Sequence, residues 1–324
     1  MTRRLFSAAP GAVIGVTMLL LALAPHVSAA ENAPTAPGDH EEMLQFGGMA
    51  RSFIVHVPSG FDPHRKTPVV IMLHGRGGSG ARVENQTGWD ALADRENFLA
   101  VFPDATPQSP DQPPNFRTNP RQWNWSSGNG GGAGKQVDDV GFIAALIDLL
   151  ESSYGADPAR VYVTGFSNGG SISWVLGAEL TSRIAAIAPV SGELWSKPLK
   201  LTGAMPTLFI IGTADPLNPL AGGSATSPWG NAQNHAPVED TLSGWRDALG
   251  CTGEPRTVRD SGGLHDVLWN KCAHGEFEYV TVEGQGHVWP GAQVALPHIF
   301  GNSTNLLDAT STIWTFFKAH PKHE

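Results

Sequence analysis

Apolar positions fall into short runs separated by longer stretches with helical spacing. Two segments alternate apolar and polar residues, as strands with one covered face do: Ser52–Pro58, which we expect at a sheet edge, and Phe277–Val282. Continuous apolar runs, typical of strands covered on both faces, occur at Pro68–His74, Phe98–Phe102, Arg160–Gly165, Ile184–Val190 and Thr207–Ile211. Helical spacing covers Val83–Asp94, Val140–Tyr154, Ser167–Leu180, Val238–Leu249 and Asn305–His320.

Strands and helices therefore alternate along most of the chain. This order predicts an α/β fold, in which helices cover both faces of a mostly parallel, doubly wound sheet. We find no internal repeat and no break in composition after residue 44, so residues 45–324 are expected to form one domain.

The N-terminus has the three parts of a secretory signal peptide. Arg3 and Arg4 precede an uncharged stretch from Ala12 to Ala24, and Val27-Ser28-Ala29 is a small-residue cleavage signal. The alternative is an uncleaved anchor, but the apolar run is short for a bilayer span of about 20 residues. We expect residues 1–30 to be removed, residues 31–44 to form a disordered leader, and the mature protein to be secreted or periplasmic, without a membrane anchor.

Composition narrows the classes of function. The 324 residues are 41% apolar and 16% charged, with a formal net charge of −9, which becomes −11 once Arg3 and Arg4 are removed. Nucleic-acid binding is disfavoured, because it needs clustered basic residues. Two cysteines exclude a cysteine-based zinc cluster. After export Cys251 and Cys272 can form a disulfide; the alternative is two free thiols.

One long segment, Asp104–Gln136, has no regular pattern. Loops of this length in compact domains are usually functional or disordered. Because it carries Trp123 and Trp125, we predict a substrate-binding loop rather than a disordered one.

A candidate nucleophile lies in Gly165-Phe166-Ser167-Asn168-Gly169, between a predicted strand and a predicted helix. This is the setting of a nucleophile elbow, where small residues two positions from the serine permit a sharp turn. Ser167 would then stand at a helix N-terminus, where the dipole favours a developing negative charge.

A serine nucleophile needs a base and an acid that orients it, which in this architecture follow in the order Ser, Asp, His. Asp215 directly follows the strand at Thr207–Ile211, and His287 follows the strand that ends at Val282. Asp215 could instead serve only as a turn residue before a proline. Trp289, two residues beyond His287, is a candidate substrate contact or a core residue.

An oxyanion hole needs two backbone N–H groups, one of them from the residue after the nucleophile, here Asn168. The glycine-rich turn His74–Gly80 supplies the second, for which we select Arg76. His74 precedes the elbow in the chain, so we expect it to shape this turn rather than to act as the base. The turn could also merely link a strand to a helix.

Several of these segments together resemble a known family. His74-Gly75-Arg76-Gly77-Gly78, Arg160–Gly170 and Gly286-His287-Val288-Trp289-Pro290-Gly291 stand in the order found in polyhydroxybutyrate-depolymerase-like esterases, which include feruloyl and acetylxylan esterases. The resemblance covers roughly residues 45–320, including the late cysteine pair. It implies the α/β-hydrolase fold, a Ser167–His287–Asp215 triad and no metal or organic cofactor. Many depolymerases of the family carry cysteine where this chain has Arg76, which puts polyhydroxybutyrate as a substrate in doubt.

The sequence therefore predicts a secreted serine hydrolase that cleaves ester bonds of a polyester or an acylated polysaccharide fragment. Two alternatives stay open: an amide-bond hydrolase with the same triad, such as a peptidase or polyaspartate hydrolase, and a non-catalytic carbohydrate-binding protein. The acyl group and the oligomeric state are not determined by the sequence.

Overall fold

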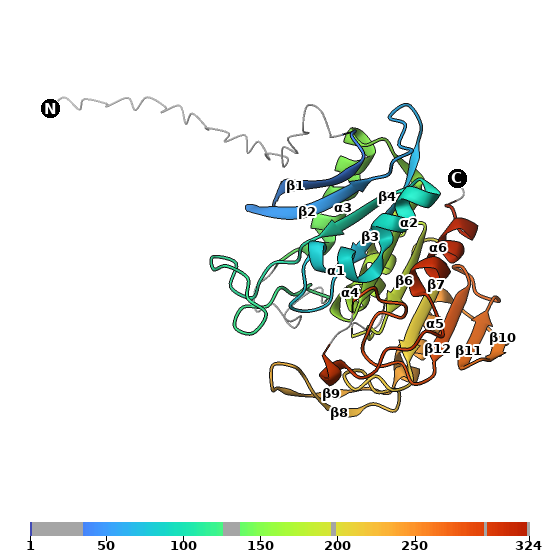
Figure 1. The fold of residues 1–324 in the computed structure, drawn as a ribbon. Helices are drawn as coiled ribbons and strands as arrows, with labels where there is room; N and C mark the ends of the chain where they lie inside the picture. The colour runs from blue at the N-terminus through green and yellow to red at the C-terminus, as the bar shows by residue number, and fades with distance from the viewer. Residues whose placement is uncertain (2–34, 126–136, 196–198, 295–296, 323–324) are drawn as a thin grey trace.

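The computed structural model describes Met1 and residues 35–125, 137–195, 199–294 and 297–322. A ten-stranded sheet with the strand order β1-β2-β4-β3-β5-β6-β7-β12-β11-β10 forms its centre (Figure 1). These strands are β1 (Gly38–Phe46), β2 (Met49–Val57), β3 (Thr67–Leu73), β4 (Leu99–Pro103), β5 (Ala156–Phe166), β6 (Ala186–Val190), β7 (Thr207–Gly212), β10 (Arg256–Ser261), β11 (Leu264–Trp269) and β12 (Phe277–Val282). The run from β4 to β12 is parallel, and the strands outside it pair antiparallel.

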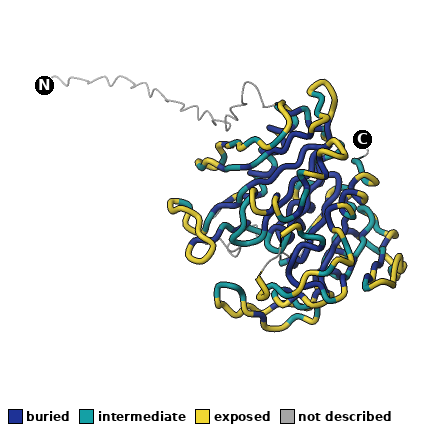
Figure 2. Tube along the Cα trace, viewed as in Figure 1, coloured by how far each residue is buried: buried dark blue, intermediate teal, exposed yellow. Residues whose placement is uncertain are grey.

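Helices cover both faces of the sheet, as predicted. They are α1 (Gly80–Thr87), α2 (Trp89–Glu96), α3 (Asp139–Ser153), α4 (Asn168–Glu179), α5 (Val238–Leu249) and α6 (Ala309–Ala319). Alternate residues of β3 point to opposite faces: Ile71 packs in the cluster under α3, α4 and α5, and Met72 in the cluster under α1, α2 and α6. Both faces of the central strands are therefore buried, while loops form the exposed surface (Figure 2).

The predicted helix over Val83–Asp94 is divided in two. Gly88 has φ +66°, a left-handed conformation that ends α1 and begins α2. The helix predicted over Asn305–His320 starts later, at Ala309, because the side chain of Asp308 caps it by accepting a hydrogen bond from the N–H of Ser311. The helix over Val238–Leu249 has the predicted bounds.

The predicted disordered leader is wrong from Gly38 onward. Gly38–Phe46 forms β1 and pairs along its length with β2, so β2 is not the edge strand that its alternation suggested. Most residues of β1 are polar, only Leu44 is buried, and backbone hydrogen bonds to β2 order the strand. The predicted signal peptide (1–30) and the first residues of the leader lie outside the described residues. No helix of the described residues is long and apolar enough to cross a bilayer.

The sheet also extends beyond β12 through the hairpin β10–β11, which the sequence patterns did not indicate. Every residue of β10 is exposed, so this strand has no buried apolar face that its sequence could show.

The disulfide between Cys251 and Cys272 joins the end of α5 to the segment after β11, and the predicted pairing is therefore present. A separate two-stranded sheet, β8 (Gly223–Thr226) and β9 (Ala232–His235), lies between β7 and α5 in the chain.

The double variant Cys251→Ser/Cys272→Ser is expected to lose about 3 kcal/mol of unfolding free energy, because the cross-link no longer restricts the unfolded chain. The two cysteines are 21 residues apart in sequence. Urea denaturation under non-reducing conditions measures the loss, and the wild type under reducing conditions should behave like the variant. Equal denaturation midpoints for all three samples would show that the disulfide does not stabilise the fold.

Candidate active site

Ser167 occupies the turn between β5 and α4, in a backbone conformation that serine seldom adopts (φ +57°, ψ −119°). Two glycines make this turn possible. A Cβ on Gly165 would lie 2.3 Å from the carbonyl oxygen of Gly169, and a Cβ on Gly169 would lie 2.1 Å from that of Leu73. The spacing Gly-x-Ser-x-Gly is therefore required by contacts of β5, α4 and the end of β3.

Three side chains from separate strand ends meet at this turn. The Oγ of Ser167 lies 2.8 Å from Nε2 of His287, whose Nδ1 lies 2.8 Å from Oδ2 of Asp215. Asp215 follows β7 and His287 follows β12, and these two strands are parallel neighbours in the sheet. His287 and Asp215 are 2% and 3% exposed, so their interaction is shielded from water.

Backbone contacts hold the side chains of Asp215 and His287 in place. Oδ1 of Asp215 accepts hydrogen bonds from the N–H groups of Leu217 and Asn218, at 2.9 and 2.8 Å. The N–H of His287 donates to the carbonyl of Phe300 at 2.6 Å. The imidazole is therefore fixed from both sides, by its own backbone and by an oriented carboxylate.

The turn after β3 lies against Ser167. A Cβ on Gly75 would stand 3.2 Å from Cβ of Ser167, which places the following N–H, that of Arg76, beside the serine. Among the described residues, neither this N–H nor that of Asn168 has a hydrogen-bond acceptor. The side chain of Asn168 binds the backbone of Trp123 through both its oxygen and its nitrogen, so the loop 104–125 is tied to the start of α4.

His74 shapes this turn, as the sequence suggested. Its Nδ1 donates to the carbonyl of Gly75 at 2.7 Å, and its Nε2 accepts from the N–H of Ala105 at 3.1 Å. The contact with Ala105 requires a neutral imidazole, since a protonated Nε2 cannot accept a hydrogen bond. Burial lowers the pKa of His74 from 6.5 to about 4, so the ring is neutral near pH 7.

This lowered pKa predicts a loss of stability in mild acid. Unfolding restores the pKa of 6.5, so the unfolded chain binds the extra proton as the pH falls from 6.5 toward 4. The stabilisation is complete above pH 6.5, and its loss at low pH is at most about 3 kcal/mol. Denaturation midpoints across this pH range should fall less steeply for His74→Asn than for the wild type. Parallel curves for the two proteins would contradict this role of His74.

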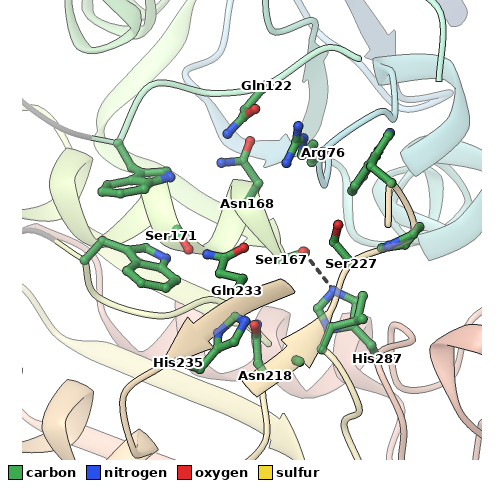
Figure 3. A pocket seen from close by; sticks show the side chains of 16 residues that line it. Arg76, Gln122, Ser167, Asn168, Ser171, Asn218, Ser227, Gln233, His235 and His287 are labelled. Carbon is green, nitrogen blue, oxygen red and sulfur yellow. Dashed lines mark hydrogen bonds between the residues drawn. The ribbon is translucent and has the colours of Figure 1, made fainter. Parts of the chain in front are cut away.

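A pocket of about 120 Å³ opens over Ser167 and His287. Figure 3 shows Arg76 and Gln122 on one side of Ser167, and Asn218, His235 and His287 on the other. The remaining lining residues come from the loop 104–125, α4, the loop after β6, the segment after β7 and the β8–β9 hairpin: Trp125, Asn168, Ser171, Trp195, Leu217, Ala225, Ser227, Pro228, Trp229 and Gln233.

Of the three predicted substrate-binding tryptophans, only Trp125 lines this pocket. The prediction is wrong for Trp123, whose side chain is completely buried and donates its indole N–H to the carbonyl of His74. It is also wrong for Trp289, which is 2% exposed and donates to Thr310. Both are core residues. For Trp289, a core position was the alternative that the sequence had left open.

Two other tryptophans line the pocket and were not predicted to do so, Trp195 and Trp229. Trp195 follows β6 closely, and Trp229 lies between a proline and a glycine at the tip of β8–β9. A tryptophan next to turn-forming residues was the sequence feature that could have indicated these two pocket residues. His235 also lines the pocket, where its Nδ1 pairs with Glu193 at 2.5 Å.

One group outside the pocket has the composition of a cation site. Possible ligand atoms of Asp39, His56 and Glu84 all lie within 4.8 Å of one another. These residues belong to β1, β2 and α1, and none of them lines the pocket over Ser167. Within this group, Nδ1 of His56 pairs with Oδ1 of Asp39 at 2.5 Å.

Comparison with known proteins gives consistent matches. A family model described as Phospholipase/Carboxylesterase matches residues 55–243. Feruloyl esterase C of Emericella nidulans is 27% identical across 83% of this chain and 84% of its own length. Poly(3-hydroxybutyrate) depolymerase of Ralstonia pickettii is 24% identical across 98% of this chain and 66% of its own length.

In other matches this chain covers less of the matched protein, or the likeness shows the fold alone. Feruloyl esterase B of Piromyces equi is 28% identical across 73% of this chain, but the chain spans only 42% of that protein. The crystal structure of native pOPH superimposes with a TM-score of 0.58 over 89% of both chains, at 16% identity. At that identity the likeness extends to the arrangement of sheet and helices only.

Proposed function

Because the chain belongs to the phospholipase/carboxylesterase family, we propose that its ester hydrolysis runs through Ser167, His287 and Asp215. The family and the mostly parallel sheet establish an α/β-hydrolase of the esterase type. The observation that carries the catalytic proposal is the unbroken chain of contacts from Ser167 Oγ through His287 to Asp215, each 2.8 Å long.

In the first step, Nε2 of His287 takes the hydroxyl proton as Ser167 Oγ attacks the ester carbonyl. The resulting oxyanion accepts hydrogen bonds from the N–H groups of Arg76 and Asn168. Asp215 holds the imidazolium through Nδ1, and His287 then donates the proton to the departing alcohol. Water, activated by the same imidazole, hydrolyses the acyl-enzyme and releases the acid.

The substrate we propose is a polyester or an acylated polysaccharide fragment. The names of the relatives support this class, since they include feruloyl esterases and a poly(3-hydroxybutyrate) depolymerase. A pocket with three tryptophans at its wall, Trp125, Trp195 and Trp229, suits the apolar or ring portions of such substrates.

We also propose that the protein acts outside the cytoplasm. The signal-peptide pattern at residues 1–30 supports export, and so does the disulfide between Cys251 and Cys272, because disulfides persist in oxidising compartments.

A paired substrate screen tests the proposed reaction. p-Nitrophenyl butyrate, methyl ferulate and hydroxybutyrate oligomers are compared with amides of matched acyl groups, beginning with p-nitrobutyranilide. We expect turnover of the esters and none of the amides above background. Amide turnover at a comparable rate would instead favour the amide-hydrolase alternative, and no turnover of any ester would contradict the proposal.

A further inference from the structure

Arg76 is a cationic residue of the pocket over Ser167. Among the residues that the structure describes, it forms no ion pair, although the chain as a whole is acidic. Its side chain is half-buried, and this burial lowers its pKa, because desolvation disfavours the charged form. Arginine stays protonated at neutral pH nonetheless. A desolvated charge without a counter-ion is costly unless a ligand completes it.

The guanidinium is held in a fixed orientation. It lies over the ring of Trp229, with Cζ 4.3 Å from the ring centre. Trp229 in turn packs on Phe116 and donates its indole N–H to the carbonyl of that residue at 2.5 Å. A guanidinium over an aromatic ring can still donate hydrogen bonds from N–H groups at its edge.

Within the part of the chain that the structure describes, three buried polar atoms around this pocket have no hydrogen-bond partner: Nε of Arg76, Oε1 of Gln122 and Oγ of Ser227. Leaving such an atom unpaired costs about 1–3 kcal/mol. All three residues line the same pocket as Ser167; in Figure 3 Ser227 lies beside Ser167, and Arg76 and Gln122 lie together above it. Their grouping indicates a subsite for a polar part of the substrate rather than for an apolar chain.

We propose that this subsite binds a carboxylate carried by the ester substrate, with Arg76 as its main contact. The inference rests on the proposed ester hydrolysis at Ser167. Arg76 starts at the turn beside Ser167, so its side chain reaches groups only a few bonds from the scissile carbonyl. A carboxylate there accepts paired hydrogen bonds from the guanidinium edge, and the hydroxyl of Ser227 can donate to it as well.

Substrate pairs that differ only in charge test the proposal. On the acyl side, p-nitrophenyl monoadipate is compared with p-nitrophenyl hexanoate. On the alcohol side, 4-acetoxybutyrate is compared with 4-acetoxybutyramide, followed by acetate release. We expect kcat/KM to favour the anionic member of at least one pair by about 10- to 100-fold, the range for hydrogen bonds to a charged group. Added salt should reduce this preference.

Variants assign the preference to the side chain of Arg76. Arg76→Gln retains the backbone N–H but removes the charge, so the ratio of kcat/KM values within the pair should fall to about one. Arg76→Lys should keep part of the preference, because it keeps the charge without the planar guanidinium. Arg82→Gln, an exposed arginine of α1 outside the pocket, serves as the matched control and should keep the full ratio.

The outcomes separate this inference from the proposed function. Equal kcat/KM values within both pairs, with the neutral esters hydrolysed, would overturn the carboxylate subsite and leave the ester hydrolase in place. A preference that survives in Arg76→Gln would also overturn it. Hydrolysis of neither member of either pair would count against the proposed function itself.

Discussion

Replacing Ser167 by alanine is expected to lower kcat for p-nitrophenyl butyrate by about 10⁴- to 10⁶-fold. The reason is geometric: Ser167 Oγ is the atom that His287 Nε2 contacts at 2.8 Å, and alanine leaves that base without a proton to remove. Steady-state kinetics on the purified mature protein measure the effect. Ser167→Ala removes only the hydroxyl, so the denaturation midpoint should change little.

Ser173→Ala is the matched control for this experiment. Ser173 is a buried serine of α4, the helix that Ser167 precedes, and its hydroxyl donates a hydrogen bond to the carbonyl of Gly169 rather than to a triad residue. Its replacement should leave kcat within a few-fold of the wild type. If Ser167→Ala retained a tenth of wild-type activity, Ser167 would not be the nucleophile.

Replacing Asp215 by asparagine is expected to lower kcat by about 10⁴-fold while preserving the fold. The N–H groups of Leu217 and Asn218 both donate to Oδ1, so the amide oxygen of asparagine should keep that position. The amide nitrogen then faces Nδ1 of His287, where the carboxylate oxygen lay at 2.8 Å. An N–H donor there forces the proton onto Nε2, which can no longer accept the proton of Ser167.

Kinetics near pH 7 with p-nitrophenyl butyrate test this expectation. The same substitution at Asp308, which caps α6 and lines no part of the pocket, is the control and should leave kcat unchanged, because asparagine also caps helices. An Asp215→Asn variant with kcat close to that of the wild type would show that Asp215 does not orient His287.

Strands with two buried faces were the elements most clearly predicted. Their continuous apolar runs, which alternate with helical patterns along the chain, predict strands covered on both faces. β3, β4, β6 and β7 are indeed buried at every residue. β1 and β10 were missed because both are largely polar and have almost no buried side chains, and they are ordered by backbone pairing to a neighbouring strand. Sequence periodicity registers side-chain burial, whereas backbone pairing leaves no such pattern.

The residues of the candidate site could likewise be predicted only in part. Ser167, Asp215 and His287 could be selected because each follows a strand at the carboxyl edge of the sheet, where chain order restricts the choice. The tryptophans could not be sorted in this way. Trp123 and Trp125 are two residues apart on one loop, yet only Trp125 lines the pocket, because the backbone of Trp123 is bound by Asn168 and its indole is buried.

The central claim is that Ser167 is an activated nucleophile, and labelling with a fluorophosphonate tests it most directly. Only a serine whose hydroxyl is deprotonated by a neighbouring base reacts rapidly with this reagent. Intact-mass and peptide mass spectrometry should find one label per chain, on Ser167, with loss of ester hydrolysis in parallel and no labelling of Ser167→Ala. An unlabelled wild type that hydrolyses esters, or a label on another residue, would contradict the account.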